Sequence, residues 1–253
     1  MFDAKLLLSD LKNKLSSDMN IICTVAGKIT GTMEFSGIAS ITDANIIFYS
    51  VHKDTMSYNL LDILTISCSH AGITIVTGNN TFIFEKIEMG DFEKFVKTLL
   101  VKTSPKEMRL EGNQSKTVVL KNNSLVIAKK KGLFNTEREK AIPINGIAGI
   151  EIKKPGPLIV GYIQFQTAGS IVAGSSYTYT GGAFSAVNDE NSVVFSDMQN
   201  YEMALKIKQY IEGFNTKGTE NTDNLLKLKQ LLDAEAISLD EYNNKKREIL
   251  NRL

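Results

Sequence analysis

One pattern of apolar residues occurs twice in the chain at a constant spacing, and it limits the possible folds more than any other feature. Ile142 follows Tyr58 by 84 residues, and Ile150 follows Ile66 by the same 84. A repeat of this kind indicates that one structural unit has been duplicated. The matched positions are Tyr58, Leu60, Ile63 and Ile66 in the first copy and Ile142, Ile144, Ile147 and Ile150 in the second.

Both copies consist of short runs rich in Ile, Val, Thr, Phe and Tyr, separated by turn residues. Such runs are typical of antiparallel strands joined in hairpins, and IASI-TDAN-IIFYS and KTVVL-KNN-SLVIA are examples. Each copy ends in a segment with helical periodicity, which begins after Asp91 in the first copy and near Asp197 in the second. The sequence therefore predicts a mainly β (α+β) protein.

A short motif, present in full in the second copy and in part in the first, is similar to one found in a known domain family. Residues 142–147 read IPINGI, whereas residues 58–60 read YNL and lack the proline. The motif resembles that of bacterial pleckstrin-homology-like (PH-like) domains. The resemblance implies two tandem PH-like antiparallel β-barrels, each closed by a C-terminal helix. We expect the first domain at 19–103 and the second at 104–213, with a hairpin insertion near 156–191.

Helical segments are expected outside the two copies. Leu7, Leu11 and Leu15 recur every four residues, which predicts an amphipathic N-terminal helix within 1–18. Near the other end, the polar stretch 214–221 is expected to be a linker.

The last segment, 222–253, carries a second resemblance. Its motifs follow the order of the SHOCT domain, a short C-terminal helical hairpin, and Ser238 and Glu241 have the spacing of a capping box. The resemblance implies a role in oligomerisation or in binding another protein. The motifs are LLD at 231–233, IS at 237–238, DEY at 240–242, KK at 245–246 and IL at 249–250.

A hairpin of about 30 residues buries too little surface to fold alone. Its apolar face must therefore dock on the rest of the chain, on a second copy or on another protein. The residues expected to make this contact are Leu225, Leu228, Leu232, Tyr242 and Ile249.

A run of three lysines, Lys129, Lys130 and Lys131, lies at the end of a predicted hairpin. One interpretation is a solvated loop, because lysine commonly protects strand edges from aggregation. The alternative is a contact with an anion or with lipid. Together with Phe2 and Leu6 to Leu8, the run would then make the chain a membrane-surface adaptor. The formal net charge of +1 and the lack of interleaved aromatics argue against nucleic acid.

The segment 169–182, GSIVAGSSYTYTGG, is rich in small residues and is similar to a phosphate-binding loop. That loop needs a lysine where this chain has Ser175, so we do not expect phosphate binding. We expect instead a hairpin that offers an aromatic contact surface. The contact residues would be Tyr177, Tyr179 and Phe184.

The residues that carry catalysis or hold metals are scarce. His52 and His70 are the only histidines, and Cys23 and Cys68 are the only cysteines. The C-x-H pair at Cys68 and His70 has no second pair to complete a zinc site. We therefore expect no catalytic residue, no metal and no cofactor. With two cysteines and no apolar run long enough for a membrane span, we expect a cytoplasmic location.

These patterns together predict a non-enzymatic bacterial or prophage interaction module. Its PH-like domains would bind a protein or peptide, and its SHOCT hairpin would mediate oligomerisation. The alternative is the membrane-surface adaptor, which would contact anionic lipid.

Overall fold

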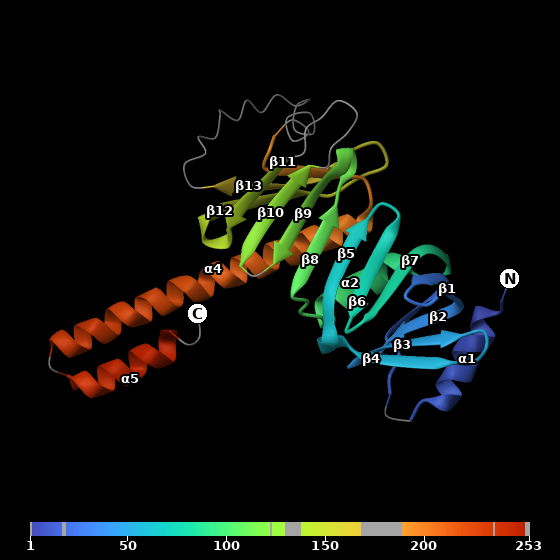
Figure 1. Cartoon of the computed structure of the whole chain (residues 1–253), viewed down its shortest axis with the longest axis horizontal. Helices are drawn as coiled ribbons and strands as arrows, with labels where there is room; N and C mark the ends of the chain where they lie inside the picture. Colours follow the sequence, from blue (N-terminus) through green and yellow to red (C-terminus); the bar gives the residue numbers. More distant parts are fainter. Residues whose placement is uncertain are drawn as a thin grey trace. The chain divides into compact units, whose positions relative to one another are not determined.

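A computed structural model describes residues 2–16, 19–121, 123–129, 138–167, 189–234 and 236–250 (Figure 1). The chain divides into two units, Met1–Ile207 and Lys208–Leu253. The first unit holds the strands, and the second holds helix only.

The first copy of the repeat consists of strands, one 3-10 turn (η1) and a helix. Buried phenylalanines contribute to its core, where Phe48 stacks on Phe82 at 4.1 Å between ring centroids. The elements are β1 Cys23–Gly31, β2 Phe35–Ile41, β3 Asn45–Ser50, β4 Thr55–Asn59, η1 Leu60–Asp62, β5 Ile63–Ser69, β6 Gly72–Thr77, β7 Asn80–Met89 and α2 Phe92–Lys102.

The second copy has the same order of strands, with a 3-10 turn (η3) at the same place. Leu60 and Ile144 each begin a 3-10 turn, lie 84 residues apart and are buried. The predicted duplication is therefore visible in the backbone. The elements are β8 Glu107–Glu111, η2 Asn113–Ser115, β9 Lys116–Lys121, β10 Ser124–Lys129, β11 Arg138–Pro143, η3 Ile144–Gly146, β12 Ile147–Lys153, β13 Gly161–Thr167, β14 Ser192–Phe195 and α4 Met198–Asp233.

The prediction of two closed barrels is wrong. Among the described strands, eleven form one open sheet in the order β11-β10-β9-β8-β5-β6-β7-β1-β2-β3-β4, and β12-β13-β14 form a second sheet. The two copies are joined by β5 and β8, which pair in parallel and lie side by side in Figure 1. Alternating apolar residues fix which face of a strand is buried, but they do not specify its neighbour. A parallel pairing between copies therefore leaves no local signal in the sequence.

The N-terminal helix α1, Ala4–Lys14, lies within the predicted range of 1–18. The Asp3 carboxylate accepts hydrogen bonds from the backbone N–H groups of Lys5 and Leu6, which caps the helix. Leu7 and Leu11 are buried in a cluster with residues of β1, β2 and β3. The apolar face of α1 is thus part of the core of the first copy.

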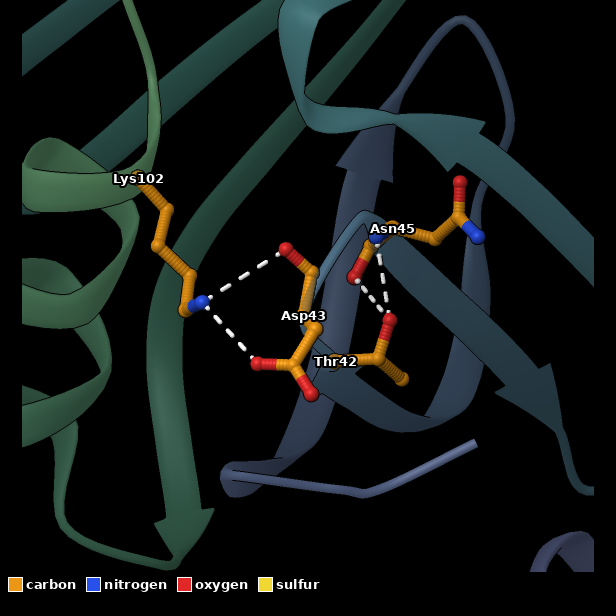
Figure 2. A network of polar contacts seen from close by, with 4 residues as sticks. All are labelled: Thr42, Asp43, Asn45 and Lys102. Atoms are coloured by element: carbon orange, nitrogen blue, oxygen red, sulfur yellow. Dashed lines mark hydrogen bonds and ion pairs between the residues drawn. The ribbon is translucent and has the colours of Figure 1, made fainter. Parts of the chain in front are cut away.

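Helix α2 is capped as predicted, because the Asp91 carboxylate accepts from the N–H of Lys94. The helix packs on β1 and β2 of the open sheet rather than closing a barrel. Figure 2 shows its last turn, where the Lys102 ammonium bonds to the carboxylate and the carbonyl oxygen of Asp43. The hydroxyl of Thr42 accepts from the N–H of Asn45 and closes the same β2–β3 turn (Figure 2).

Helix α4 replaces the separate closing helix and linker that the sequence predicted. It runs without a break through 214–221, and α5 covers Leu239–Leu250, so the expected hairpin of 222–253 is not observed as a separate element. Gly213 and Gly218 each cost about 1 kcal/mol in a helix. Extending an existing helix is nevertheless much easier than starting one, and both neighbouring segments are good helix formers.

The buried face of α4 is formed by a few apolar residues and one polar residue. Met203, Ala204 and Ile207 are buried, whereas Leu205 is exposed. Asn200 is also buried, because its side-chain amide donates to the carbonyl oxygen of Glu111. Because Asn200 is polar, the spacing of apolar residues in the sequence does not identify it as part of the buried face of α4.

Candidate interaction surfaces

The second unit contains little buried surface of its own. Among the described residues after Ile211, no side chain is buried, although leucines recur in both helices. Leu226, Leu231 and Leu239 are 58%, 46% and 62% exposed. The five predicted contact residues are all half-buried: Leu225, Leu228, Leu232, Tyr242 and Ile249.

The polar contacts of these helices are local and exposed. The capping box is formed, since the Ser238 hydroxyl accepts from the N–H of Glu241 and the Glu241 carboxylate accepts from the N–H of Ser238. The N–H and the hydroxyl of Ser238 both donate to the Glu241 carboxylate, which lowers the pKa of Glu241. Lys229 pairs with Asp233 one turn later. Exposed pairs of this kind contribute little to stability, so apolar contacts must supply most of it.

A polar cavity of about 560 Å³ lies where the two copies meet in the first unit. The carbonyl oxygens of Ser69 and His70 at its rim accept from the side-chain amide of Gln199. Gln114 and Ser115 both have positive φ, near +60°, which is unfavourable for residues other than glycine. The lining residues are Ser69, His70, Ala71, Glu111, Gly112, Asn113, Gln114, Ser115, Thr117 and Ser196.

The chemistry of this cavity is that of a hydrogen-bonding site. Cys68 lies next to it in the chain but is fully buried, and burial raises the pKa of its thiol, with Asp197 adding to the shift. A protonated buried thiol is a poor nucleophile. Within the described ranges, no three His, Cys, Asp or Glu side chains come together as a metal site would need.

The basic run is described only in part. Lys129 is half-buried at the end of β10, where it lies opposite Lys116 on one side and Arg138 on the other. Lys130 and Lys131 lie outside the described residues. So do the predicted aromatic contacts of the glycine-rich segment: Tyr177, Tyr179 and Phe184.

Sequence reasoning missed the environment of Lys116. Lys116 is buried in β9, and its ammonium donates to the carbonyl oxygens of Asp189 at 2.7 Å and Ser192 at 3.1 Å. Desolvation lowers the pKa of Lys116, and the neighbouring charge of Lys129 lowers it further. The contact holds the start of β14 against β9. Nothing in the sequence distinguishes Lys116 from other lysines, because its partners are backbone atoms.

Of the three consecutive leucines near the N-terminus, Leu6 to Leu8, one is exposed at the surface. Leu6 is 59% exposed, Leu7 is buried and Leu8 packs against the α1 cluster. Among the helices that the structure describes, none combines the length and apolar character needed to cross a membrane.

The fold and its surfaces define an α+β protein with a duplicated β body and a helical C-terminal segment. No family model matches the chain. No curated protein matches it either. The resemblances to PH-like and SHOCT domains therefore stay predictions from the sequence.

Proposed function

We propose that this protein is a non-enzymatic interaction module whose C-terminal segment, 208–253, associates with a second copy. One observation carries the proposal: after Ile211 none of the described side chains is buried, although leucines line the helices. A helical segment of this size cannot stabilise itself without a further apolar surface. Contiguous exposed apolar residues of this kind are typical of association sites.

The β body would bind a protein or peptide partner. The cavity at the junction of the two copies supports this half of the proposal, because its lining residues offer hydrogen-bonding groups to a partner. We further propose a cytoplasmic location. The free thiols of Cys23 and Cys68 support it, because reduced cysteines are usual there.

The association is tested by changing three of the half-buried leucines. The variant Leu225→Ser, Leu228→Ser, Leu232→Ser should associate much more weakly than the unchanged chain in sedimentation equilibrium, because the apolar face of its C-terminal segment is lost. The control substitutes three exposed polar residues of the same helix with serine: Asp223, Lys227 and Gln230. It should keep the mass of the unchanged chain. A monomeric unchanged chain would reject the proposal.

The alternative, a membrane-surface adaptor, has less support. It needs both the N-terminal apolar residues and the Lys129–Lys131 run, since one weak signal gives only marginal binding. Leu7 and its neighbours already pack on the sheet, so α1 would have to detach first. Co-sedimentation with vesicles of anionic lipid tests it, and a triple Lys→Glu variant of the run is the control.

A further inference from the structure

The two copies differ at the strand that ends the large sheet. Among the described strands, β4 and β11 lie at the two ends of the 11-stranded sheet. They are equivalent in the repeat, because Thr55 corresponds to Glu139 and Asn59 to Pro143 at the spacing of 84 residues. An end strand presents backbone groups on which another strand can pair.

The register identifies which residues present these groups. Leu60 donates its N–H to Ala44, and Asp54 accepts from Ser50, so the even-numbered residues of β4 bond to β3. The odd-numbered residues therefore direct their N–H and C=O groups outward, away from the sheet. They are all exposed: Thr55, Ser57 and Asn59.

The same reasoning applies to β11. Ile144 donates its N–H to Asn123, so the outward residues of β11 are Glu139, Ala141 and Pro143. Proline has no N–H to offer, and Glu139 brings a charge to the edge. Both features are known ways of preventing strand addition.

Strand β4 lacks this protection. Its sequence, TMSYN, contains no charge and no proline, and its outward residues keep their N–H groups. Met56 and Tyr58 alternate with them and are half-buried, and the Tyr58 ring lies 5.3 Å from that of Phe82. A strand that pairs here must be uncharged and must place apolar side chains beside Met56 and Tyr58.

We propose that β4 of a second copy of this chain occupies this edge, antiparallel and related by a two-fold axis through Ser57. β4 itself meets both requirements. In this register Ser57 lies opposite its own equivalent, and the outward groups of Thr55 meet those of Asn59 in the other copy. Met56 then lies beside Tyr58 of the second copy, which is a favourable sulfur–aromatic contact. No like charges oppose each other within the strand pair.

This inference rests on the part of the proposed function in which the β body binds a protein, and it names a second copy of the chain as that protein. It does not depend on the C-terminal association. A five-residue strand pair is smaller than the interface of a stable dimer, so the expected association is weak. The test therefore uses the full chain with Leu225, Leu228 and Leu232 changed to serine. In that background any remaining association belongs to the β body.

The first experiment places a charge on the two-fold axis. Ser57→Lys puts two ammonium groups opposite each other and should weaken self-association by about tenfold or more in sedimentation equilibrium. Ser57→Pro, which removes an outward N–H at an edge position that tolerates proline, should do the same. The matched control is Ala141→Lys, at the equivalent position of β11, and it should change nothing. Equal weakening by the control would overturn the inference.

The second experiment detects the axis directly. Opposed residues of a hydrogen-bonded antiparallel pair have Cα atoms about 5.5 Å apart, within the range that a disulfide spans. In a Cys23→Ser background, in which Cys68 is fully buried, Ser57→Cys should give a covalent dimer under mild oxidation. Ala141→Cys should stay monomeric. Equal cross-linking at both positions, or none at Ser57, would show that no such axis exists, and pairing with another protein's strand would then be the alternative.

Discussion

Lys116 is a buried charged residue, and its ammonium has two backbone carbonyl oxygens as partners. A buried polar group is stable only while its hydrogen bonds are made, because water cannot replace them. This side chain therefore holds the first residues of β14 on β9.

Lys116→Met should destabilise the protein by about 1–3 kcal/mol, since it leaves the carbonyl oxygens of Asp189 and Ser192 without their donor. Urea unfolding followed by far-UV circular dichroism measures the change. The matched control is Lys106→Met, at an exposed position, for which we expect less than about 0.5 kcal/mol. Similar values for both variants would contradict the role of Lys116.

Glu107, at the start of β8, is a carboxylate that makes the stability of the protein depend on pH. Partial burial raises the pKa of Glu107, but its bonds to Lys121 and Arg109 outweigh burial, and the net pKa is below the ordinary value of 4.5. A carboxylate whose folded pKa is lowered stabilises the protein above the unfolded pKa, and this contribution is lost as the pH falls through the folded value.

Glu107→Gln should therefore reduce stability by about 1 kcal/mol or less at neutral pH and have less effect below pH ~4. The free energy of unfolding measured between neutral and acidic pH should fall less steeply in the variant. A parallel pH dependence in both proteins would show that Glu107 does not contribute in this way.

At the scale of single elements, helix α4 is the main departure from what the sequence predicted. Local patterns identified the hairpins, the cap of α2 by Asp91 and the capping box at Ser238. They failed at 214–221, because Gly, Asn and Thr are typical of linkers, whereas the helices on both sides extend through them. Propensity is a weak influence where the neighbouring residues are already helical.

Gly218→Ala tests the continuity of α4, since a side chain added at this position meets no atom within 4 Å. Within a helix the substitution should raise stability by about 0.5–1 kcal/mol and increase the helical circular dichroism signal. Gly156→Ala, at a turn position with equal space, is the control and should leave the helical signal unchanged. If residue 218 lay in a flexible linker, neither variant would change that signal.

At the scale of the whole molecule, the parallel pair of β5 and β8 makes one sheet from two copies of the repeat. Thr65 to Cys68 pair with Glu107 to Leu110, and Ile66, Cys68, Met108 and Leu110 are buried there. Two independent barrels would instead be joined only by the chain at 103–106. The β body should therefore open as one cooperative structure.

Hydrogen exchange measured by mass spectrometry tests this cooperativity. Backbone amides in β5 and β8 should be protected to the same extent as those in β1 and β7, because their exchange requires opening of the shared sheet. The C-terminal helix α5, whose described side chains are not buried, provides a fast-exchanging comparison. Faster exchange in β8 than in β7 would indicate that the two copies unfold separately.

The sequence by itself determined the duplication, the hairpins, the N-terminal helix and the apolar residues of the C-terminal segment. These depend on local periodicity and turn chemistry, which act over a few residues. Tertiary structure alone decided that β5 pairs with β8, that Lys116 is buried and that β4 and β11 end the sheet. Such features depend on which distant segments meet, and a strand's own residues specify its buried face without specifying its neighbour.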